Sequence, residues 1–328
     1  MAPVAIQDQT APAQPSAPLK NAAQPASATP GLSKQSLGNL SSRPLDRVWR
    51  GNEQGTVKLQ VAVPDFGDDL YAKREWVKQH LAGAFQMWGS NGFGEGVAGH
   101  ITVRDPVKPD HYWMNPFAVH FSAVTVDNLV LVTPEGWVSP EGAQLPINTA
   151  GFHLHSAIHD TRPEIQAAAH CHTVHGKAWS VFGKPVEMLT QDACMFYDNL
   201  SVYNSFGGIV LAADEGANIA KALGPKNKCA ILQNHGLMTL GDTVDEAAYL
   251  FAALERQCKV QLMMEAALAG NPSLKKNVID DEDAAFTAAT LTHWEIAYTN
   301  AQPEFNLLVQ ERGHLFLGKN AKLVQGRS

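Results

Sequence analysis

Two apolar segments of this chain end in histidine, 63 residues apart in the sequence. The first is the run AAAHCH, which contains His170 and His172, and the second leads to His235 in LQNHG. Side chains at positions i and i+2 of a strand point to the same face, so His170 and His172 can bind one ion while Cys171 packs on the other face. Three protein ligands leave a coordination position open for water or substrate. The three histidines therefore predict a catalytic metal centre.

Chance pairing is the competing interpretation. The chain holds 13 histidines in 328 residues, so pairs two positions apart can arise without a function. Both histidine segments, however, follow short apolar runs that are typical of buried strands. This context favours metal ligands over ordinary core or surface histidines.

The chain divides into three parts by composition. Residues 1–45 are rich in Ala, Pro, Ser and Gln and have no apolar periodicity. Such a segment cannot bury enough apolar surface to offset its ordering entropy, so we predict a disordered leader. Residues 46–275 are long enough for one compact domain with a sizeable core. Residues 276–328 are expected to form a C-terminal helical extension, with one or two helices within 281–316.

Strand and helix patterns alternate within the middle part, which predicts a single α/β/α layered domain with a central sheet and helical cover. The patterns predict helices over residues 71–88, 149–161, 215–223 and 244–269. They predict strands over 100–104, 128–133, 207–212, 228–233 and 237–240, besides the strand that ends at the HCH pair. Residues 105–117 are rich in Pro, Asp and aromatic residues, so we expect a long loop there.

The net charge and the apolar content of the sequence argue against nucleic acids and membranes as partners. The net charge is −7 without long runs of one sign, which argues against nucleic-acid binding and against attraction to an anionic membrane. No apolar segment reaches 18 residues, so we expect no membrane span. The four cysteines lie in apolar segments without paired spacing, which predicts reduced thiols and a cytoplasmic protein.

Five motifs resemble the class II aldolase/adducin family. In chain order they are GHITVR at 99–104, LVTPEG at 131–136, HSAIHDTRPE at 155–164, HCH at 170–172 and NHGL at 234–237. The resemblance covers roughly residues 70–270 and implies a central, mainly antiparallel sheet and a homotetramer. In the family's enzymes the HxH pair and the NHG histidine bind Zn²⁺, which makes His170, His172 and His235 the expected ligands. Three imidazoles suit Fe²⁺ or another divalent metal nearly as well.

The sequence also departs from the family's aldolases. They carry a glutamate about 19 residues before the first metal histidine, and the same count back from His170 gives Gly151. The head domain of adducin lacks this glutamate too. The residues that hold the sugar phosphate in the family are replaced by His100, Glu135, Thr149 and Ala150. A glutamate would repel a phosphate dianion, so we expect a non-phosphorylated substrate.

The resemblance implies a metal-dependent lyase that acts on a small hydroxy-carbonyl or carboxylate substrate. The expected reaction is aldol or retro-aldol cleavage, or decarboxylation, through an enolate that the metal stabilises. Two alternatives stay open: a non-haem iron oxygenase on the same scaffold, and a non-catalytic, adducin-like interaction protein.

Without the glutamate, another group has to move protons. His100 and His153 are candidates because imidazole titrates near neutral pH, and Glu135 is a third. Tyr197 resembles a tyrosine that family aldolases bring in from a neighbouring subunit. For binding of the substrate we expect Arg104, which can pair with a carboxylate through two hydrogen bonds, and Gly99 at the start of the first motif.

Two further histidines are expected to have a structural role instead. His155 and His159 lie on the segment before the metal strand, and we expect them to be core or surface residues satisfied by backbone groups.

Overall fold

Seven strands form one sheet in the order β3-β2-β1-β4-β7-β6-β5 in a computed structural model that describes residues 41–208, 213–318 and 322–326. Every neighbouring pair is antiparallel except β5 and β6, which run parallel. The strand bounds are β1 His100–Arg104, β2 Tyr112–Met114, β3 Val130–Val132, β4 Ala167–Cys171, β5 Leu200–Tyr203, β6 Cys229–Leu232 and β7 Gly236–Gly241. The predicted α/β fold with a mainly antiparallel sheet is confirmed.

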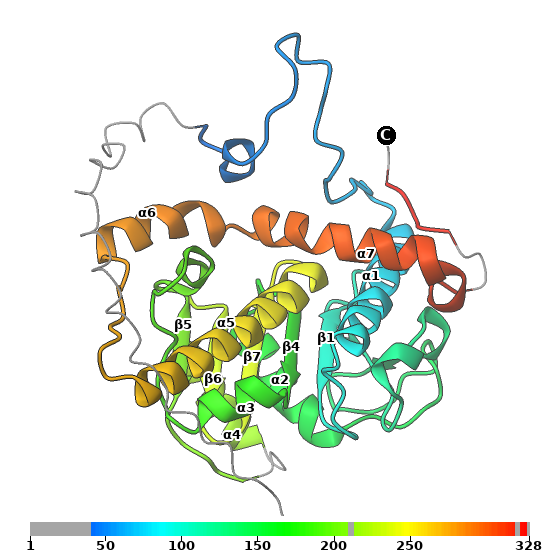
Figure 1. Ribbon diagram of the computed structural model, residues 1–328. Helices are drawn as coiled ribbons and strands as arrows, with labels where there is room; N and C mark the ends of the chain where they lie inside the picture. The colour runs from blue at the N-terminus through cyan, green and yellow to red at the C-terminus, as the bar shows by residue number, and fades with distance from the viewer. Residues whose placement is uncertain (1–40, 209–212, 319–321, 327–328) are drawn as a thin grey trace, which may run out of the picture. The chain divides into compact units, whose positions relative to one another are not determined.

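Helices cover both faces of this sheet (Figure 1). Their bounds are α1 Leu70–Ser90, α2 Thr149–Thr161, α3 Val174–Ser180, α4 Ala213–Leu223, α5 Val244–Gly270, α6 Asp281–Leu291 and α7 Trp294–Phe316. The largest core cluster joins α1 and α5 to one face of the sheet, and a second cluster joins α2 and α4 to the other. The described residues also contain four short 3₁₀ turns, at Pro44–Arg47, Phe121–Ala123, Val126–Asn128 and Gln191–Phe196.

Strand register decides which side chains share the α2 face of the sheet. In the pairing of β1 with β4, His100 lies opposite His170, and Thr102 lies opposite Ala168. Alternate residues of a strand point to the same face, so His100 and Thr102 share the face on which Ala168 packs with α2 and α4. Polar residues of β1 thus meet the histidine strand beneath α2.

One loop prediction was wrong. The predicted loop over 105–117 contains β2, whose three residues pair with β1 and β3 and are fully buried. The sequence reads as a loop because this strand is only three residues long and is flanked by Pro and Asp.

The strand predicted over 207–212 is not seen where the chain is described: residues 207 and 208 are irregular, and 209–212 lie outside the described residues. The strand of this region is instead β5, which pairs in parallel with β6.

The predicted helices are confirmed, and capping side chains explain where two of them begin. Asp69 accepts a hydrogen bond from the amide of Ala72 at the start of α1, and Thr243 accepts one from the amide of Glu246 at the start of α5. These side chains satisfy amides that have no partner inside the helix.

Residues 43–328 form one compact unit that includes both C-terminal helices. Helix α7 packs against α1, where the ring of Phe305 lies so close to Gly83 that a Cβ there would be 2.2 Å from it. The predicted boundary near residue 275 falls between α5 and α6. The predicted leader lies almost entirely outside the described residues.

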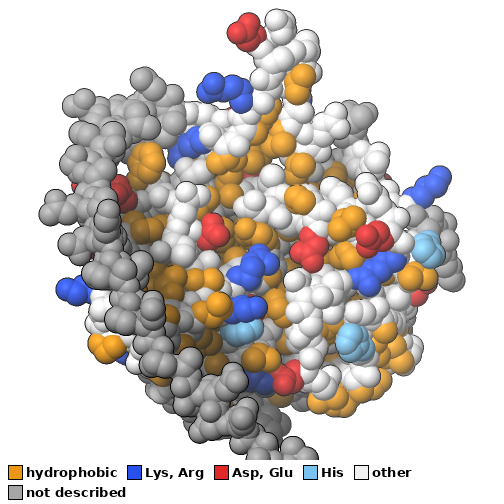
Figure 2. All heavy atoms as spheres, viewed as in Figure 1, with side chains coloured by type: hydrophobic (Ala, Val, Ile, Leu, Met, Phe, Trp, Pro, Cys, Tyr) orange, Lys and Arg blue, Asp and Glu red, His pale blue; other side chains and the backbone are white. Residues whose placement is uncertain are grey.

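Charged side chains are interspersed on the face shown in Figure 2, where basic and acidic groups alternate among apolar ones. None of the helices in the described ranges combines the length and apolar character needed to cross a lipid bilayer.

Candidate metal centre

The three predicted ligands converge. One ring nitrogen from each of His170, His172 and His235 lies within 4.8 Å of the other two. The ring centroids are 4.7 Å to 5.0 Å apart, and the rings meet edge to face. This spacing puts a single ion within reach of all three imidazoles, so the donor set fits a divalent metal with an open position.

A backbone carbonyl orients the ring of His170, and a tight turn carries His235. The Nδ1 of His170 lies 2.8 Å from the carbonyl oxygen of Leu237, to which it donates, and this leaves Nε2 free as a ligand atom. Metal-binding histidines usually make such a hydrogen bond with the nitrogen that does not bind the metal. His235 sits in the turn between β6 and β7 and follows Asn234, which has φ of +60°, a conformation that asparagine tolerates well.

Glu255 of α5 fixes the turn that follows the HCH pair. Its carboxylate accepts hydrogen bonds from the hydroxyl of Thr173, the amide of Gly176 at 2.6 Å, and the amide and Nδ1 of His175 at 3.1 Å and 2.8 Å. An anion at the beginning of α3 also interacts favourably with the helix dipole. Glu255 therefore holds the backbone that carries His172.

We expect Glu255→Gln to destabilise the protein, because an amide cannot accept all four hydrogen bonds. Hydrogen bonds to charged groups contribute roughly 1.5–3 kcal/mol, so unfolding in urea should show a loss of about 2 kcal/mol. Zinc affinity should fall about tenfold, as for groups that orient metal ligands. Glu311→Gln on the exposed surface of α7 is the control, and equal behaviour of the two variants would contradict the assignment.

The ligand imidazoles are held in the neutral form that binds metals. Burial lowers the pKa of His170 well below its usual value, and the neighbouring imidazoles of His235 and His100 lower it further. Burial also lowers the pKa of His172, and it brings the pKa of His235 to about 4.

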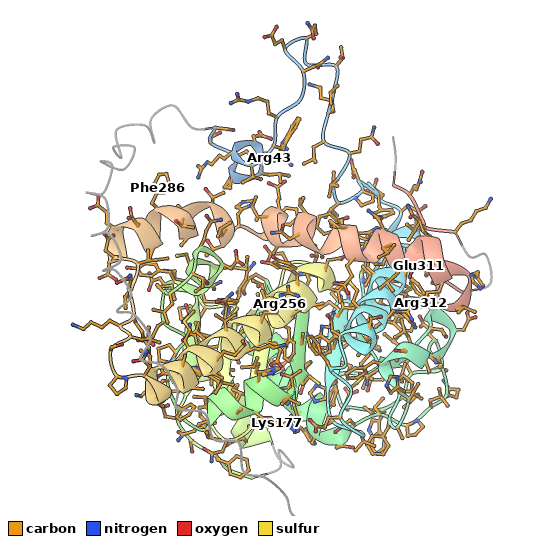
Figure 3. The ribbon with its side chains drawn as sticks, viewed as in Figure 1. Arg43, Lys177, Arg256, Phe286, Glu311 and Arg312 are labelled. Atoms are coloured by element: carbon orange, nitrogen blue, oxygen red, sulfur yellow. The ribbon has the colours of Figure 1, made fainter. Side chains whose placement is uncertain are left out.

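The trio lies in a pocket of about 430 Å³ between α2, α3 and the end of the sheet. Its other lining side chains include Phe206 and one cation, Lys177, which Figure 3 shows on α3. Lys177 forms an ion pair with Glu95 and is 39% exposed. The described part of the pocket thus has three histidines at its bottom, an apolar wall that includes Phe206, and the positively charged side chain of Lys177 at its edge.

His100 takes the place that the missing glutamate leaves. A Cβ built on Gly151 would lie 2.2 Å from the Cδ2 of His100 and 2.5 Å from its Nε2. Gly151 lies in the first turn of α2, which the side chain of Asn148 caps by accepting from the amide of Gly151. The absent side chain at 151 therefore allows an imidazole from β1 to reach the pocket, where His100 is a lining residue.

Gly99 is also a lining residue, and its backbone needs glycine. Its φ is +101°, and a Cβ there would be 2.8 Å from both the sulfur of Cys171 and the ring of Phe121.

Four other predicted residues lie elsewhere, two of which are bound by other groups of the fold. Arg104 donates to the backbone carbonyls of His159, Ile165 and Pro109, so it holds the fold instead of facing the pocket. Glu135 is exposed and accepts from the hydroxyl of Thr133. It is not among the pocket's lining residues, so the predicted repulsion of phosphate by Glu135 has no basis in the structure.

His153 and Tyr197 do not join the trio either. The half-buried His153 lies on α2 with its ring beside Phe152, outside the pocket lining. Tyr197 lies in a separate surface hollow with Lys226. Its predicted role across a subunit interface stays a prediction.

Sequence reasoning missed functional groups that the fold brings together. His155 and His159 are buried, and hydrogen bonds link them to His100 and Thr102. Their spacing of four residues on one helix face, and the i, i+2 spacing of His100 and Thr102 on a strand, were signals for this contact. Nothing in the sequence singled out Lys177.

Acid should destabilise the metal-free protein. Burial lowers the pKa of His100, His155 and His159, so these rings stay neutral in the folded state but bind protons when unfolded below pH 6.5. The stabilisation that these neutral rings give to the folded state is therefore present above pH 6.5 and is lost as the pH falls. These three histidines alone predict a loss of about 4 kcal/mol between pH 7.5 and pH 5.5, and the metal-free ligand histidines add to it. Urea unfolding in chelator at both pH values measures it, and an unchanged free energy would contradict it.

Known proteins are similar to this chain in sequence and in fold. The family model described as Class II Aldolase and Adducin N-terminal domain matches residues 79–262. Decarboxylase NovR of Streptomyces niveus is 41% identical over 72% of this chain and 85% of that protein. The 4-hydroxy-3-prenylphenylpyruvate oxygenase/4-hydroxy-3-prenylbenzoate synthase of Streptomyces roseochromogenus subsp. oscitans is 40% identical over 72% of this chain and 83% of that protein.

A solved structure named L-fuculose 1-phosphate aldolase from Glaciozyma antarctica PI12 is similar along most of its length. It has a TM-score of 0.70 and 40% identity, and the match covers 77% of this chain and 96% of that one. The match of the family model and these similarities lead to one conclusion. The chain belongs to the class II aldolase and adducin family.

Proposed function

We propose that this protein is a metal-dependent lyase that cleaves a C–C bond next to a carbonyl or carboxylate group, by decarboxylation or by retro-aldol cleavage. The observation that carries the proposal is the convergence of His170, His172 and His235 at the base of a pocket. A relative named a decarboxylase, 41% identical, supports this reaction class.

A divalent metal, Zn²⁺ first and Fe²⁺ as an alternative, would supply Lewis acidity to a substrate oxygen in this pocket. His170, His172 and His235 would hold it, and Glu255 and the Leu237 carbonyl orient them. His100 is the proton-transferring group that we assign in place of the glutamate, because it is the pocket-lining histidine outside the trio.

The pocket supports a substrate with an anionic group and an apolar body. Lys177 is the cation among its described lining residues, and Phe206 and Val97 give it an apolar wall. Ala150 and Gly151 line it without a hydroxyl group for a phosphate. An aromatic 2-oxo acid has this combination, and the printed name of the relative from Streptomyces roseochromogenus contains such an acid.

Turnover by the full chain loaded with Zn²⁺ or Fe²⁺ tests the proposal. We expect anaerobic release of CO₂ from an aromatic 3-oxo acid, or cleavage of an aromatic 4-hydroxy-2-oxo acid to pyruvate and an aldehyde, and loss of that activity in chelator. Lys177→Met should raise KM roughly tenfold or more while metal content stays the same, because a charge-assisted hydrogen bond is lost. Cleavage of fuculose 1-phosphate at ordinary rates would overturn the assignment of substrate class.

An oxygenase is the second candidate, which the 40% identical relative named an oxygenase favours. Oxygen consumption by the Fe²⁺-loaded protein with an aromatic 2-oxo acid, and no turnover without oxygen, would identify it. A protein that binds metal but turns over none of these compounds would fit the non-catalytic, adducin-like alternative.

We also propose a homotetramer that works in the cytoplasm. The family's enzymes complete their sites across subunits, and the exposed apolar side chains Val97, Val174 and Phe206 lie on or beside the pocket. All four cysteines are free and buried, as expected in a reducing compartment. Light scattering at micromolar concentration tests the oligomer, and a monomer would contradict it.

A further inference from the structure

A second cavity lies apart from the metal pocket, between α1, α7 and the segments 60–64 and 323–325. Its volume is about 220 Å³, and among the described residues it shares no lining residue with the metal pocket. Helices α1 and α7 lie against each other beside it (Figure 1). Three polar side chains are almost fully buried here: His80 and Asp245 are 4% exposed, and Gln302 is 6% exposed. His80 and Gln302 line the cavity.

Hydrogen bonds hold the walls of this cavity in place. The hydroxyl of Tyr298 on α7 donates to the carbonyl of Ala62 over 3.3 Å. Gln79 on α1 accepts from the amide of Val324 at 2.8 Å and donates to the carbonyl of Lys322 at 2.7 Å. Three parts of the chain that are far apart in the sequence therefore meet around one space through specific contacts.

His80 presents one polar atom to the cavity. Its Nδ1 lies 2.8 Å and 2.9 Å from the two carboxylate oxygens of Asp245. A carboxylate accepts hydrogen bonds, so Nδ1 carries the proton and Nε2 of the neutral ring has the lone pair. The rings of Trp76 and Phe305 pack on the imidazole, with centroids 4.1 Å and 4.3 Å from its own. The edge that these contacts leave open carries Nε2, which no hydrogen bond from the described residues reaches.

Gln302 supplies a second acceptor. Its Nε2 donates to Asp245 at 3.0 Å and to the carbonyl of Tyr298 at 3.1 Å, so both of its N–H groups are used. Its Oε1 is then the atom that can bind a ligand, and a carbonyl oxygen requires a donor. Two acceptors at one wall of the cavity favour a ligand that carries a hydroxyl group.

The rest of the lining selects a neutral aromatic ligand. Among the described residues no lysine, arginine, aspartate or glutamate lines the cavity, so an ion would find no opposite charge. Trp76, Tyr298 and Phe305 provide aromatic surface, and the further polar side chains are neutral amides. A cavity of about 150 Å³ holds a benzene molecule, so a single six-membered ring with a substituent fits here.

Packing alone does not require the buried pair of His80 and Asp245. Desolvation of such a pair is unfavourable, and apolar side chains of similar volume would fill the same space without that cost. Asp245 lies in the first turn of α5, where the helix dipole stabilises its charge. An apolar cavity with a few convergent polar groups is the usual form of a small-molecule site.

We propose that this cavity binds a small neutral aromatic alcohol of the phenol class. The hydroxyl of the ligand donates to Nε2 of His80, which Asp245 orients, and its ring packs among Trp76, Tyr298 and Phe305. The proposal does not depend on the lyase activity, because the site shares no lining residue with the metal pocket.

Fluorine-19 NMR of 4-fluorophenol with the metal-free full chain tests this site. We expect saturable line broadening with a dissociation constant in the roughly millimolar range. The methyl ether 4-fluoroanisole has the same ring but no O–H, so it should bind roughly tenfold more weakly or not at all. Equal affinity for the two probes would overturn the hydrogen bond to His80, and no saturable binding of 4-fluorophenol would overturn the site.

A variant that fills the cavity locates the binding. Ala62 is exposed and lines the cavity, so Ala62→Phe should block it without removing His80 or Asp245, and binding of 4-fluorophenol should fall at least tenfold. Ala266→Phe is the matched control, because Ala266 is an exposed alanine of α5 outside the cavity lining. Equal binding by the two variants would contradict the assignment to this cavity.

His80→Asn tests the acceptor. The asparagine amide can still donate to Asp245 from near the position of Nδ1, but no atom replaces Nε2. We expect the preference for 4-fluorophenol over 4-fluoroanisole to disappear, and a retained preference would contradict the role of His80. A crystal structure of the wild type soaked with 4-fluorophenol does not depend on the folding of this variant. It should show the hydroxyl oxygen within hydrogen-bond distance of Nε2, and water alone in the cavity would overturn the proposal.

Discussion

His172→Ala should abolish binding of the metal at physiological concentrations. Removal of a group that only orients a ligand costs about 10–100-fold in metal affinity, so loss of a direct ligand should cost more than 100-fold. His172 is only partly buried, which makes it a better target than His170, whose truncation would leave a cavity in the core. Metal content per subunit, measured by elemental analysis after gel filtration, gives the result.

The activity of His172→Ala should fall together with its metal content, and added Zn²⁺ or Fe²⁺ should not restore it. His314→Ala is the matched control, because His314 is exposed on α7 and away from the trio. If His172→Ala retained the metal content of the wild type while folded, the assignment of His172 as a ligand would be wrong.

Gly151→Ala should have the second largest effect. The added methyl group would lie 2.2 Å from His100, a buried ring that hydrogen bonds hold in place, so the ring or α2 has to shift. Overpacking of this kind costs about 1–3 kcal/mol. Helix propensity alone predicts that alanine stabilises the helix by up to about 1 kcal/mol relative to glycine. A measured loss of stability would therefore mean that the contact with His100 outweighs this gain.

Gly270→Ala is the control for that substitution. It adds the same methyl group to a helical glycine that has no other atom within 4 Å of the new Cβ. We expect Gly270→Ala to be neutral or stabilising in thermal unfolding, and Gly151→Ala to unfold at lower temperature with a much lower kcat. A Gly151→Ala protein as stable and active as the wild type would contradict the contact of His100 with α2.

The metal ligands were predictable because their pattern is local. The two-residue spacing of His170 and His172 matches the period of a strand, and the apolar run before them predicts burial. The long helices α1 and α5 were predictable for the same reason. The convergence of His235 on the pair depends on β7 lying beside β4, a pairing that the structure shows and that the local patterns do not predict.

Contacts that depend on register were not predictable. His100 faces Gly151 because β1 pairs with β4 in one register and α2 lies over it, and neither fact can be read from periodicity. Glu255 reaches the turn after His172 from 82 residues further along the chain. The charged candidates Arg104 and Glu135 were misplaced because residue type alone does not show whether a side chain is bound by backbone groups or solvent.

X-ray absorption at the metal edge of the loaded full chain tests the central claim most directly. The account predicts three imidazole nitrogens at about 2.0–2.1 Å from Zn²⁺ and at least one further oxygen from water or substrate. Sulfur in the coordination shell, fewer than three imidazoles in the wild type, or no bound metal would contradict it.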